Sequence, residues 1–176
     1  MPAIHFFTES LDADLPSFDF YLAEQSLPAL LRVAPAAVMF PHGYLVPELA
    51  HAESKKALFV AKKLRVGLWL HGEKNNAVPV SLFDHFFRLP HVQLYALQPF
   101  TAPGNVAIVD LSQHCRTLHD VAAVTKNLDL LIAVESPVAH IAGGVGTPVW
   151  LLAKNKFIDW RWQLATSSHK SMWYPG

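Results

Sequence analysis

An alternation of short apolar segments with amphipathic ones over residues 62–152 constrains the fold more than any other feature of this sequence. Strands that alternate with helices form βα units, and consecutive βα units build a parallel sheet. The segments with the length and composition of strands are LRVGLWL (64–70), VQLYAL (92–97), VAIVD (106–110), LDLLIAV (128–134) and TPVWLL (147–152). We therefore predict a doubly wound α/β domain over residues 62–152.

The segments between these strands have helical features. Apolar residues recur at helical spacing in 80–88 and in 117–126, and Pro137 can begin a third helix. LLIAV has no polar alternation, which is typical of a strand buried on both faces. Before residue 62 we expect a short strand at 3–7, a short helix or turn at 24–32, and a further apolar run at 36–40. A helical turn near 53–60 is expected at the end of a Pro- and Gly-containing linker over 41–61.

Composition and charge exclude several classes of protein. Hydrophobic residues make up 52% of the 176 residues and charged residues 16%, which excludes a disordered chain. Lys plus Arg and Asp plus Glu number 14 each, so the net charge of zero argues against a nucleic-acid or anionic-membrane partner. A surface so poor in charge also suggests that a partner domain or second subunit covers part of it.

Other features predict the cellular compartment and the absence of a metal. Cys115 is the one cysteine, so no disulfide can form within the chain and a reducing compartment is expected. The sequence has no signal peptide and no apolar stretch near 18 residues, and we therefore expect a cytoplasmic protein without a transmembrane segment. No set of histidines and carboxylates has metal-ligand spacing, so no metal is predicted.

The most informative strand end is the one that follows LLIAV, because ligands bind beyond the carboxyl ends of parallel strands. Ser136 is a favourable N-cap and Pro137 suits the first helical position. The N–H groups of Val138 and Ala139 would then be unpaired at a helix start, where a diphosphate can bind. Glu135 at the strand tip is expected to accept hydrogen bonds from sugar hydroxyls.

Three further residues of this segment have predicted roles. We expect His140, one turn into the helix, to donate to a phosphate or sugar oxygen. Gly143 and Gly144 would let the helix lie close to a neighbouring strand. The alternative interpretation is that Ser-Pro merely begins a helix and that His140 is a packed, hydrogen-bonded side chain. The spacing by itself establishes a βα connection only.

Two other segments carry polar or aromatic candidates. Lys74, in the polar loop 71–76 after the strand at 64–70, could neutralise a phosphate, or the loop could be simply solvated. Arg161 lies between two tryptophans near the C-terminus and suits a carboxylate or phosphate. The aromatic side chains of this C-terminal stretch suit stacking on a base or a sugar. The alternative is that Trp160 and Trp162 cover the sheet edge as part of the core.

Three ordered motifs resemble a known family. VESPVAHIAGGVGTPVWLL (134–152), DWRW (159–162) and SMWYPG (171–176) resemble the C-terminal half of heptosyltransferase-type glycosyltransferases of family 9. Within that family, the likeness is greatest to the bacterial branch that is associated with tetratricopeptide repeats. The resemblance covers residues 62–176, and SLPALL (26–31) resembles the stretch just before the interdomain linker of those proteins.

The resemblance implies a GT-B fold, in which the C-terminal Rossmann-like domain holds a nucleotide-diphosphate sugar without a metal or other cofactor. It implies the end or remnant of an N-terminal domain at 1–40, a linker at 41–61 and the nucleotide-sugar-binding domain at 62–176. The predicted donor-binding residues are Glu135, Ser136, Val138, Ala139, His140, Gly143, Gly144, Lys74 and Arg161.

The sequence also departs from the family pattern. Glu135 replaces the usual Asp, and the loop at 71–79 lacks the family's downstream Asp and Arg-Ser. The region before the resemblance is too short for the family's acceptor domain, so we expect the general base to come from a second subunit or acceptor domain and assign no catalytic residue. Two hypotheses follow. The chain is the donor-binding part of a glycosyltransferase that transfers a hexose or heptose to an acceptor hydroxyl, or it is a non-catalytic, truncated module that binds a nucleotide sugar or a protein.

Overall fold

The computed structural model describes two separate units of the chain. The described residues are 20–23, 26–33, 43–59, 62–72, 77–99, 107–153, 160–162, 171, 173 and 174. The units span Met1–Ala34 and Pro35–Gly176. In the first, α1 (Leu27–Leu30) is a single helical turn with Pro28 near its start, within the segment 24–32 where a short helix or turn was predicted. The strand expected at 3–7 and the apolar run at 36–40 lie outside the described residues.

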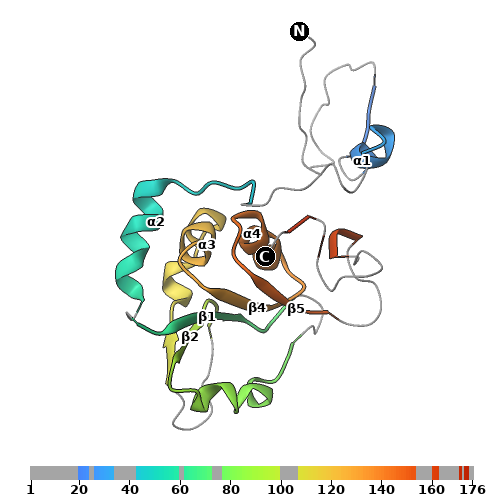
Figure 1. Cartoon of the computed structure of the whole chain (residues 1–176). Helices are drawn as coiled ribbons and strands as arrows, with labels where there is room; N and C mark the ends of the chain where they lie inside the picture. The colour runs from blue at the N-terminus through green and yellow to red at the C-terminus, as the bar shows by residue number, and fades with distance from the viewer. Residues whose placement is uncertain are drawn as a thin grey trace. The chain divides into compact units, whose positions relative to one another are not determined.

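The second unit is built around a five-stranded sheet in the order β3-β2-β1-β4-β5, in which every pair is parallel (Figure 1). This sheet confirms the predicted α/β class. The strands are β1 (Leu64–Trp69), β2 (Val92–Ala96), β3 (Ile108–Asp110), β4 (Leu130–Val134) and β5 (Val149–Leu152).

Three α-helices lie against one face of the sheet (Figure 1). They are α2 (Leu49–Lys55), which the 3₁₀ turn η3 (Lys56–Leu58) extends, α3 (Leu118–Thr125) and α4 (Pro137–Gly144). The other short 3₁₀ turns are η4 (Val80–Phe83), η5 (Phe86–Arg88), η6 (Ser112–His114) and η7 (Trp160–Trp162).

The helix predicted over 80–88 is instead the pair of 3₁₀ turns η4 and η5, which lies on the other face of the sheet (Figure 1). Phe83 and Phe86 are three residues apart, and their ring centroids are 5.9 Å apart. Phe83 ends η4 and Phe86 begins η5, and both side chains belong to the apolar cluster on this face of the sheet. The apolar spacing correctly indicated a segment that packs on the sheet, but the prediction of one helix over 80–88 was wrong.

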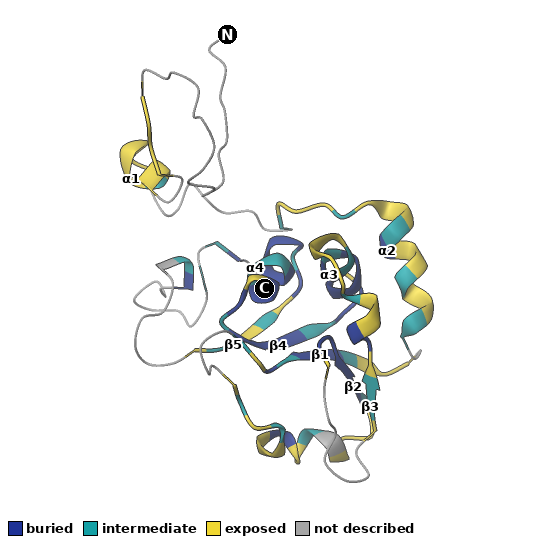
Figure 2. Cartoon of the chain, turned by 180° about the vertical axis from the view of Figure 1, so that it is seen from behind, coloured by how far each residue is buried: buried dark blue, intermediate teal, exposed yellow. Residues whose placement is uncertain are grey.

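The apolar residues of the sheet divide into two core clusters, one on each face. Figure 2 shows that the residues of the central strands are mostly buried or partly buried. On β4, Leu131 and Ala133 belong to the cluster under the helices, and Ile132 belongs to the cluster under η4 and η5. All three side chains are at most 1% exposed. This confirms that LLIAV is buried on both faces, as expected for the unbroken apolar sequence of a central parallel strand.

The amino ends of β1 and β4 are joined by a two-point ion pair. Arg65 Nη2 donates to Asp129 Oδ1 over 2.7 Å and Arg65 Nε donates to Asp129 Oδ2 over 3.0 Å. The Arg65 backbone N–H also donates to Asp129 Oδ2, over 2.8 Å. The hydrogen bond from the Arg65 side chain holds the pKa of Asp129 below its ordinary value. These contacts fix the register of the two central strands at their amino ends.

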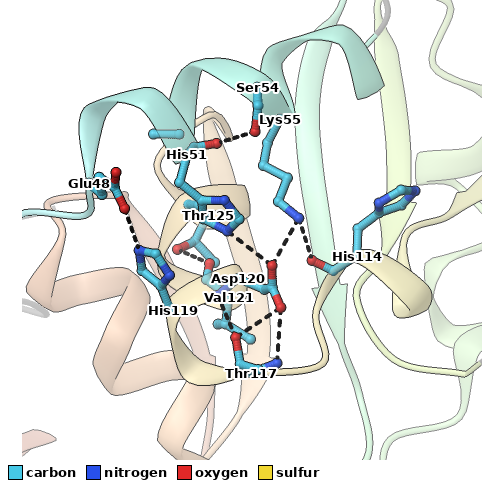
Figure 3. Close-up of polar contacts among 12 residues, drawn as sticks. Glu48, His51, Ser54, Lys55, His114, Thr117, His119, Asp120, Val121 and Thr125 are labelled. Carbon is cyan, nitrogen blue, oxygen red and sulfur yellow. Dashed lines mark hydrogen bonds and ion pairs between the residues drawn. The ribbon is translucent and has the colours of Figure 1, made fainter.

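The segment expected as a linker, 41–61, contains α2, and α2 packs on α3. Buried Ala52 faces α3, and its carbonyl accepts a hydrogen bond from Asn127 Nδ2 over 2.8 Å. Asp120 on α3 accepts from Lys55 Nζ over 2.9 Å and lies 3.0 Å from His51 Nε2 (Figure 3). α3 thus supplies partners for the polar side chains of α2 and a surface against which Ala52 is buried.

Asp120 also completes the start of α3. Thr117 is the N-cap, and its hydroxyl accepts from the Asp120 N–H while the Asp120 carboxylate accepts from the Thr117 N–H and hydroxyl (Figure 3). This reciprocal arrangement is a capping box. The hydrogen bond from Lys55, followed by that from Thr117, holds the pKa of Asp120 far below its ordinary range, although partial burial acts in the opposite direction.

We predict that Asp120→Asn destabilises the protein by about 1–2 kcal/mol near neutral pH, since it weakens a capping box and the α2–α3 contact. The pKa of the Asp120 carboxyl group is about 3.9 in the unfolded chain, and it is lower in the folded protein. The stabilisation is therefore present above about pH 4 and is lost as the pH falls toward the folded-state value. Urea unfolding of both proteins from pH 7 to pH 2.5 measures this difference, which should shrink in acid.

Glu53→Gln is the matched control, because Glu53 forms an exposed i,i+3 pair with Lys56 that should contribute little. If the free energies of unfolding of wild type and Asp120→Asn differ by the same amount down to pH 2.5, the stabilisation does not come from the ionised carboxylate.

Candidate functional site

The carboxyl edge between β1 and β4 is the point where the chain changes direction across the sheet. From β1 the chain proceeds to β2 and β3 on one side, and from β3 it crosses to β4 on the other side of β1. In open parallel sheets the connections that leave such a point diverge, and ligands bind in the space between them. Here the residues at that edge are His71 and Gly72 after β1 and Glu135 and Ser136 after β4.

Ser136 begins α4 directly after β4, as predicted. Its backbone is extended, at φ −167° and ψ 160°, and Pro137 occupies the first helical position. The Ser136 hydroxyl donates to Val134 O over 3.0 Å and accepts from Ala139 N–H over 3.4 Å. The serine thus joins the last carbonyl of the strand to the first turn of the helix, which fixes the direction of α4 at the sheet edge.

The backbone N–H groups of Val138 and Ala139, both expected to be unpaired, differ in their hydrogen bonding. The Ala139 N–H donates to Ser136 O over 3.1 Å in addition to the serine hydroxyl, so it is already engaged by the N-cap. The Val138 N–H forms no hydrogen bond within the described residues. Both side chains are buried, at 4% and 0% exposure, so these residues can meet a ligand through their backbone only. The partial positive charge of the helix start remains at this edge.

His140 is held in an aromatic cluster with Trp162 and Tyr174. Its Nδ1 lies 2.6 Å from the Tyr174 hydroxyl oxygen. Its ring stacks on that of Trp162, with centroids 4.6 Å apart and planes at 25°. Trp162 and Tyr174 are also 4.6 Å apart and are 7% and 3% exposed. The cluster joins α4 to the C-terminal part of the chain, and Trp162 packs within the core while touching the candidate site.

Trp162 has a further property of chemical interest. Its Nε1–H is buried and has no hydrogen-bond partner within the described residues. A buried indole N–H ordinarily finds an acceptor, and leaving one without a partner costs about 1–3 kcal/mol. This donor lies on a ring that is stacked against His140.

The two glycines of α4 permit close approach, but to other partners than the predicted neighbouring strand. A Cβ on Gly143 would lie 2.6 Å from Cδ1 and Cγ of Tyr174. A Cβ on Gly144 would lie 2.7 Å from Cδ1 of Leu45. The Gly144 carbonyl also accepts from the N–H groups of Tyr44 and Leu45, over 2.7 and 2.8 Å. The end of α4 is therefore crossed by the segment before α2 and by the C-terminal segment.

The remaining predicted residues lie at different places. Glu135 is half-buried at the tip of β4, next to Ser136. Arg161 is half-buried in η7 beside Trp162, and its carbonyl accepts from the Ser171 hydroxyl over 2.7 Å. Lys74 lies outside the described residues. The structure thus brings Ser136, His140 and the C-terminal aromatic residues together around α4.

Two contacts in this region were not predicted from the sequence. Tyr174 was part of a motif, yet its contact with His140 joins positions 34 residues apart and has no local signal. Gln98 follows β2 and is 8% exposed, and its amide lies 2.8 Å from His71 Nδ1. The only sequence signal for Gln98 was a polar residue directly after the apolar segment 92–97. Its contact ties the carboxyl end of β2 to that of β1.

The loop after β1 also begins and ends at this edge. His71 forms an isolated antiparallel bridge with Ala77, and the Val78 N–H donates to Leu70 O over 2.9 Å. Both ends of the loop that contains Lys74 are therefore fixed beside the carboxyl end of β1.

Two further kinds of chemistry, a reactive thiol and a metal site, concern the described part of the chain. Burial raises the pKa of the Cys115 thiol to about 12, so it is protonated at neutral pH and is a poor nucleophile. Among the described residues no group of three or more His, Cys, Asp or Glu side chains is arranged to hold a metal ion. None of the helices found there has the length and apolar character needed to span a membrane.

Comparisons with known proteins give one structural likeness. No family model matches the chain, and no curated protein matches it. Among solved structures the chain is similar to the glycosyl transferase family 9 protein from Veillonella parvula DSM 2008, with a TM-score of 0.49 and 15% identity. The similarity covers 65% of this chain, which spans 38% of the length of that protein.

We predict that Gly143→Ala disturbs the aromatic cluster, because the new Cβ would meet the Tyr174 ring close to its attachment to the backbone, where the ring has little freedom to move. The expected loss of stability is about 1–3 kcal/mol, as for other overpacked sites. A change in tryptophan fluorescence should accompany it, since Trp162 packs on Tyr174.

Gly144→Ala is the matched control. It adds the same methyl group to the same helix, but the Cβ meets the flexible end of Leu45. Equal effects of the two substitutions on unfolding and on fluorescence would show that the Tyr174 contact is not the cause.

Proposed function

We propose that the chain binds a nucleotide-diphosphate sugar at the carboxyl edge between β1 and β4 and serves as the donor-binding part of a metal-independent glycosyltransferase. One observation carries this proposal. The chain changes direction across the sheet between these strands, and at that point a serine-capped helix follows the central strand β4 directly.

Several donors around the start of α4 support binding of a diphosphate. The Val138 N–H lies in the first turn of the helix, where the partial positive charge favours an anion. His140 follows on the next turn, and the Trp162 Nε1–H lacks an acceptor within the described residues. In this proposal Glu135 accepts hydrogen bonds from sugar hydroxyls, and Lys74 and Arg161 add positive charge near the diphosphate.

The chemistry follows from these roles. An acceptor hydroxyl attacks the anomeric carbon, a new carbon–oxygen bond forms, and the bond from that carbon to the diphosphate oxygen breaks. The electron pair leaves with the diphosphate, whose growing negative charge is stabilised by the helix start and by the N–H of His140. The proton of the acceptor hydroxyl passes to a general base, which we assign to an acceptor domain or second subunit.

The sequence motifs support the same proposal. The segments at 134–152, 159–162 and 171–176 resemble family 9 glycosyltransferases, and within the family the tetratricopeptide-associated branch. The structure places parts of all three segments in contact, because His140, Trp162 and Tyr174 come from the three in turn. On this basis we propose hexosyl or heptosyl transfer.

The experiment is a thermal-shift and calorimetric titration of the full chain with UDP-, GDP-, ADP- and CMP-sugars. A ligand at 100 times its Kd adds about 2.7 kcal/mol of stability. We expect a shift with one of the diphosphate sugars and none with CMP-sugars, which carry a single phosphate.

His140→Ala should weaken that binding by about tenfold or more, since a hydrogen bond to a charged group contributes about 1.5–3 kcal/mol. His85→Ala is the matched control, because His85 is exposed in the turn between η4 and η5. Absence of any shift from a folded protein would overturn the donor-site proposal and favour a protein-interaction module.

A further inference from the structure

We infer that Tyr174 is a positioning residue for His140: its hydroxyl donates to Nδ1 of the imidazole and thereby keeps the proton on Nε2, where it can be donated to a ligand oxygen. The ligand part of this inference rests on the proposed donor site. The hydrogen bond and the protonation state of His140 can be tested without any ligand.

The geometry leaves little freedom to either ring. Tyr174 Oη and His140 Nδ1 are 2.6 Å apart, a short hydrogen bond for this pair of atoms. The tyrosine is 3% exposed, and its ring lies against the bare Cα of Gly143. Trp162 stacks on the imidazole at 25° and so fixes the plane in which Nδ1 meets the hydroxyl. The packing of the buried Tyr174 ring therefore holds its hydroxyl beside Nδ1 of His140.

The chemistry of the two groups sets the direction of the hydrogen bond. A phenol hydroxyl is a better donor than a neutral imidazole N–H, and an unprotonated imidazole nitrogen is a better acceptor than a phenol oxygen. In a neutral imidazole the nitrogen that accepts a hydrogen bond lacks a proton, so the other nitrogen carries it. Tyr174 thus selects the form of His140 with Nε2–H, which is a donor for an anionic or hydroxyl oxygen.

This arrangement explains why three distant motifs converge on one helix turn. His140 comes from α4, Trp162 from η7 and Tyr174 from the C-terminal segment. Packing alone would require only an apolar residue beside Gly143. The hydroxyl at hydrogen-bond distance from a histidine is the feature that packing does not require.

The first test is nitrogen NMR of the histidine side chains in the ¹⁵N-labelled full chain, with His140 assigned from His140→Gln. We expect unprotonated Nδ1 and protonated Nε2 for His140 at pH 7.5. Tyr174→Phe keeps the ring and removes the hydroxyl, and should shift the His140 Nδ1 resonance. Tyr95→Phe, at another buried tyrosine, is the matched control and should leave it in place. A proton on Nδ1 in wild type, or no shift in Tyr174→Phe, overturns the inference.

The second test is a double-mutant cycle on binding of whichever nucleotide-diphosphate sugar gives the thermal shift. Tyr174→Phe should weaken binding about fivefold, the effect expected for one lost hydrogen bond. In a His140→Ala background it should have no further effect, because Tyr174 acts through His140. An equal loss in both backgrounds would mean a general structural role and would overturn the inference.

The two tests separate the inference from the proposed function. If no nucleotide sugar binds but the NMR result is as expected, the donor-site proposal fails and the positioning of His140 by Tyr174 stands. If a sugar binds and the His140 resonances do not respond to Tyr174→Phe, the donor site stands and the positioning role fails.

Discussion

The pairing of β1 with β4 is the interaction on which the rest of the structure depends. These two strands are adjacent in the sheet although two other strands lie between them in the sequence. Their register is fixed at the amino ends by the two-point contact of Arg65 with Asp129, and along their length by side chains buried on both faces. Because the chain leaves the two strands in opposite directions, their carboxyl ends form the edge where a ligand can bind.

The candidate site beyond this edge consists of α4 and the segments that pack closely against it. Ser136 turns the chain from β4 into α4, and the glycines of α4 then admit other segments against its surface. Tyr174 lies against Gly143, and Leu45 lies against Gly144. Tyr174 and Leu45 each occupy the space that a Cβ atom at Gly143 or Gly144 would need. The aromatic cluster therefore depends on a glycine at position 143.

The opposite end of the helical layer is held by charge and hydrogen bonds. Asp120 caps its own helix through Thr117 and at the same time receives Lys55 from α2. One carboxylate therefore serves both the start of α3 and the contact between two helices. This explains how a segment with two prolines and a glycine at its start, at 41–48, is followed by an ordered helix.

Sequence patterns alone predicted the parallel α/β class, most strand positions and the start of α4. Those features depend on local properties: unbroken apolar strands, helical spacing, and Ser-Pro after a strand. The same local reasoning was wrong for 80–88, because apolar spacing cannot distinguish one long helix from two 3₁₀ turns that cover a sheet face. The domain limits at 40 and 61 remain predictions.

Only the tertiary structure decided what surrounds His140. The sequence marked the histidine, the tryptophan and the tyrosine as members of three separate motifs, but a contact across 34 residues leaves no periodic or local signal. Whether a histidine is packed or chemically active depends on which nitrogen is engaged and on what lies against the ring. Those are properties of side chains brought together by the sheet and by the glycines of α4, and they exist only in the folded chain.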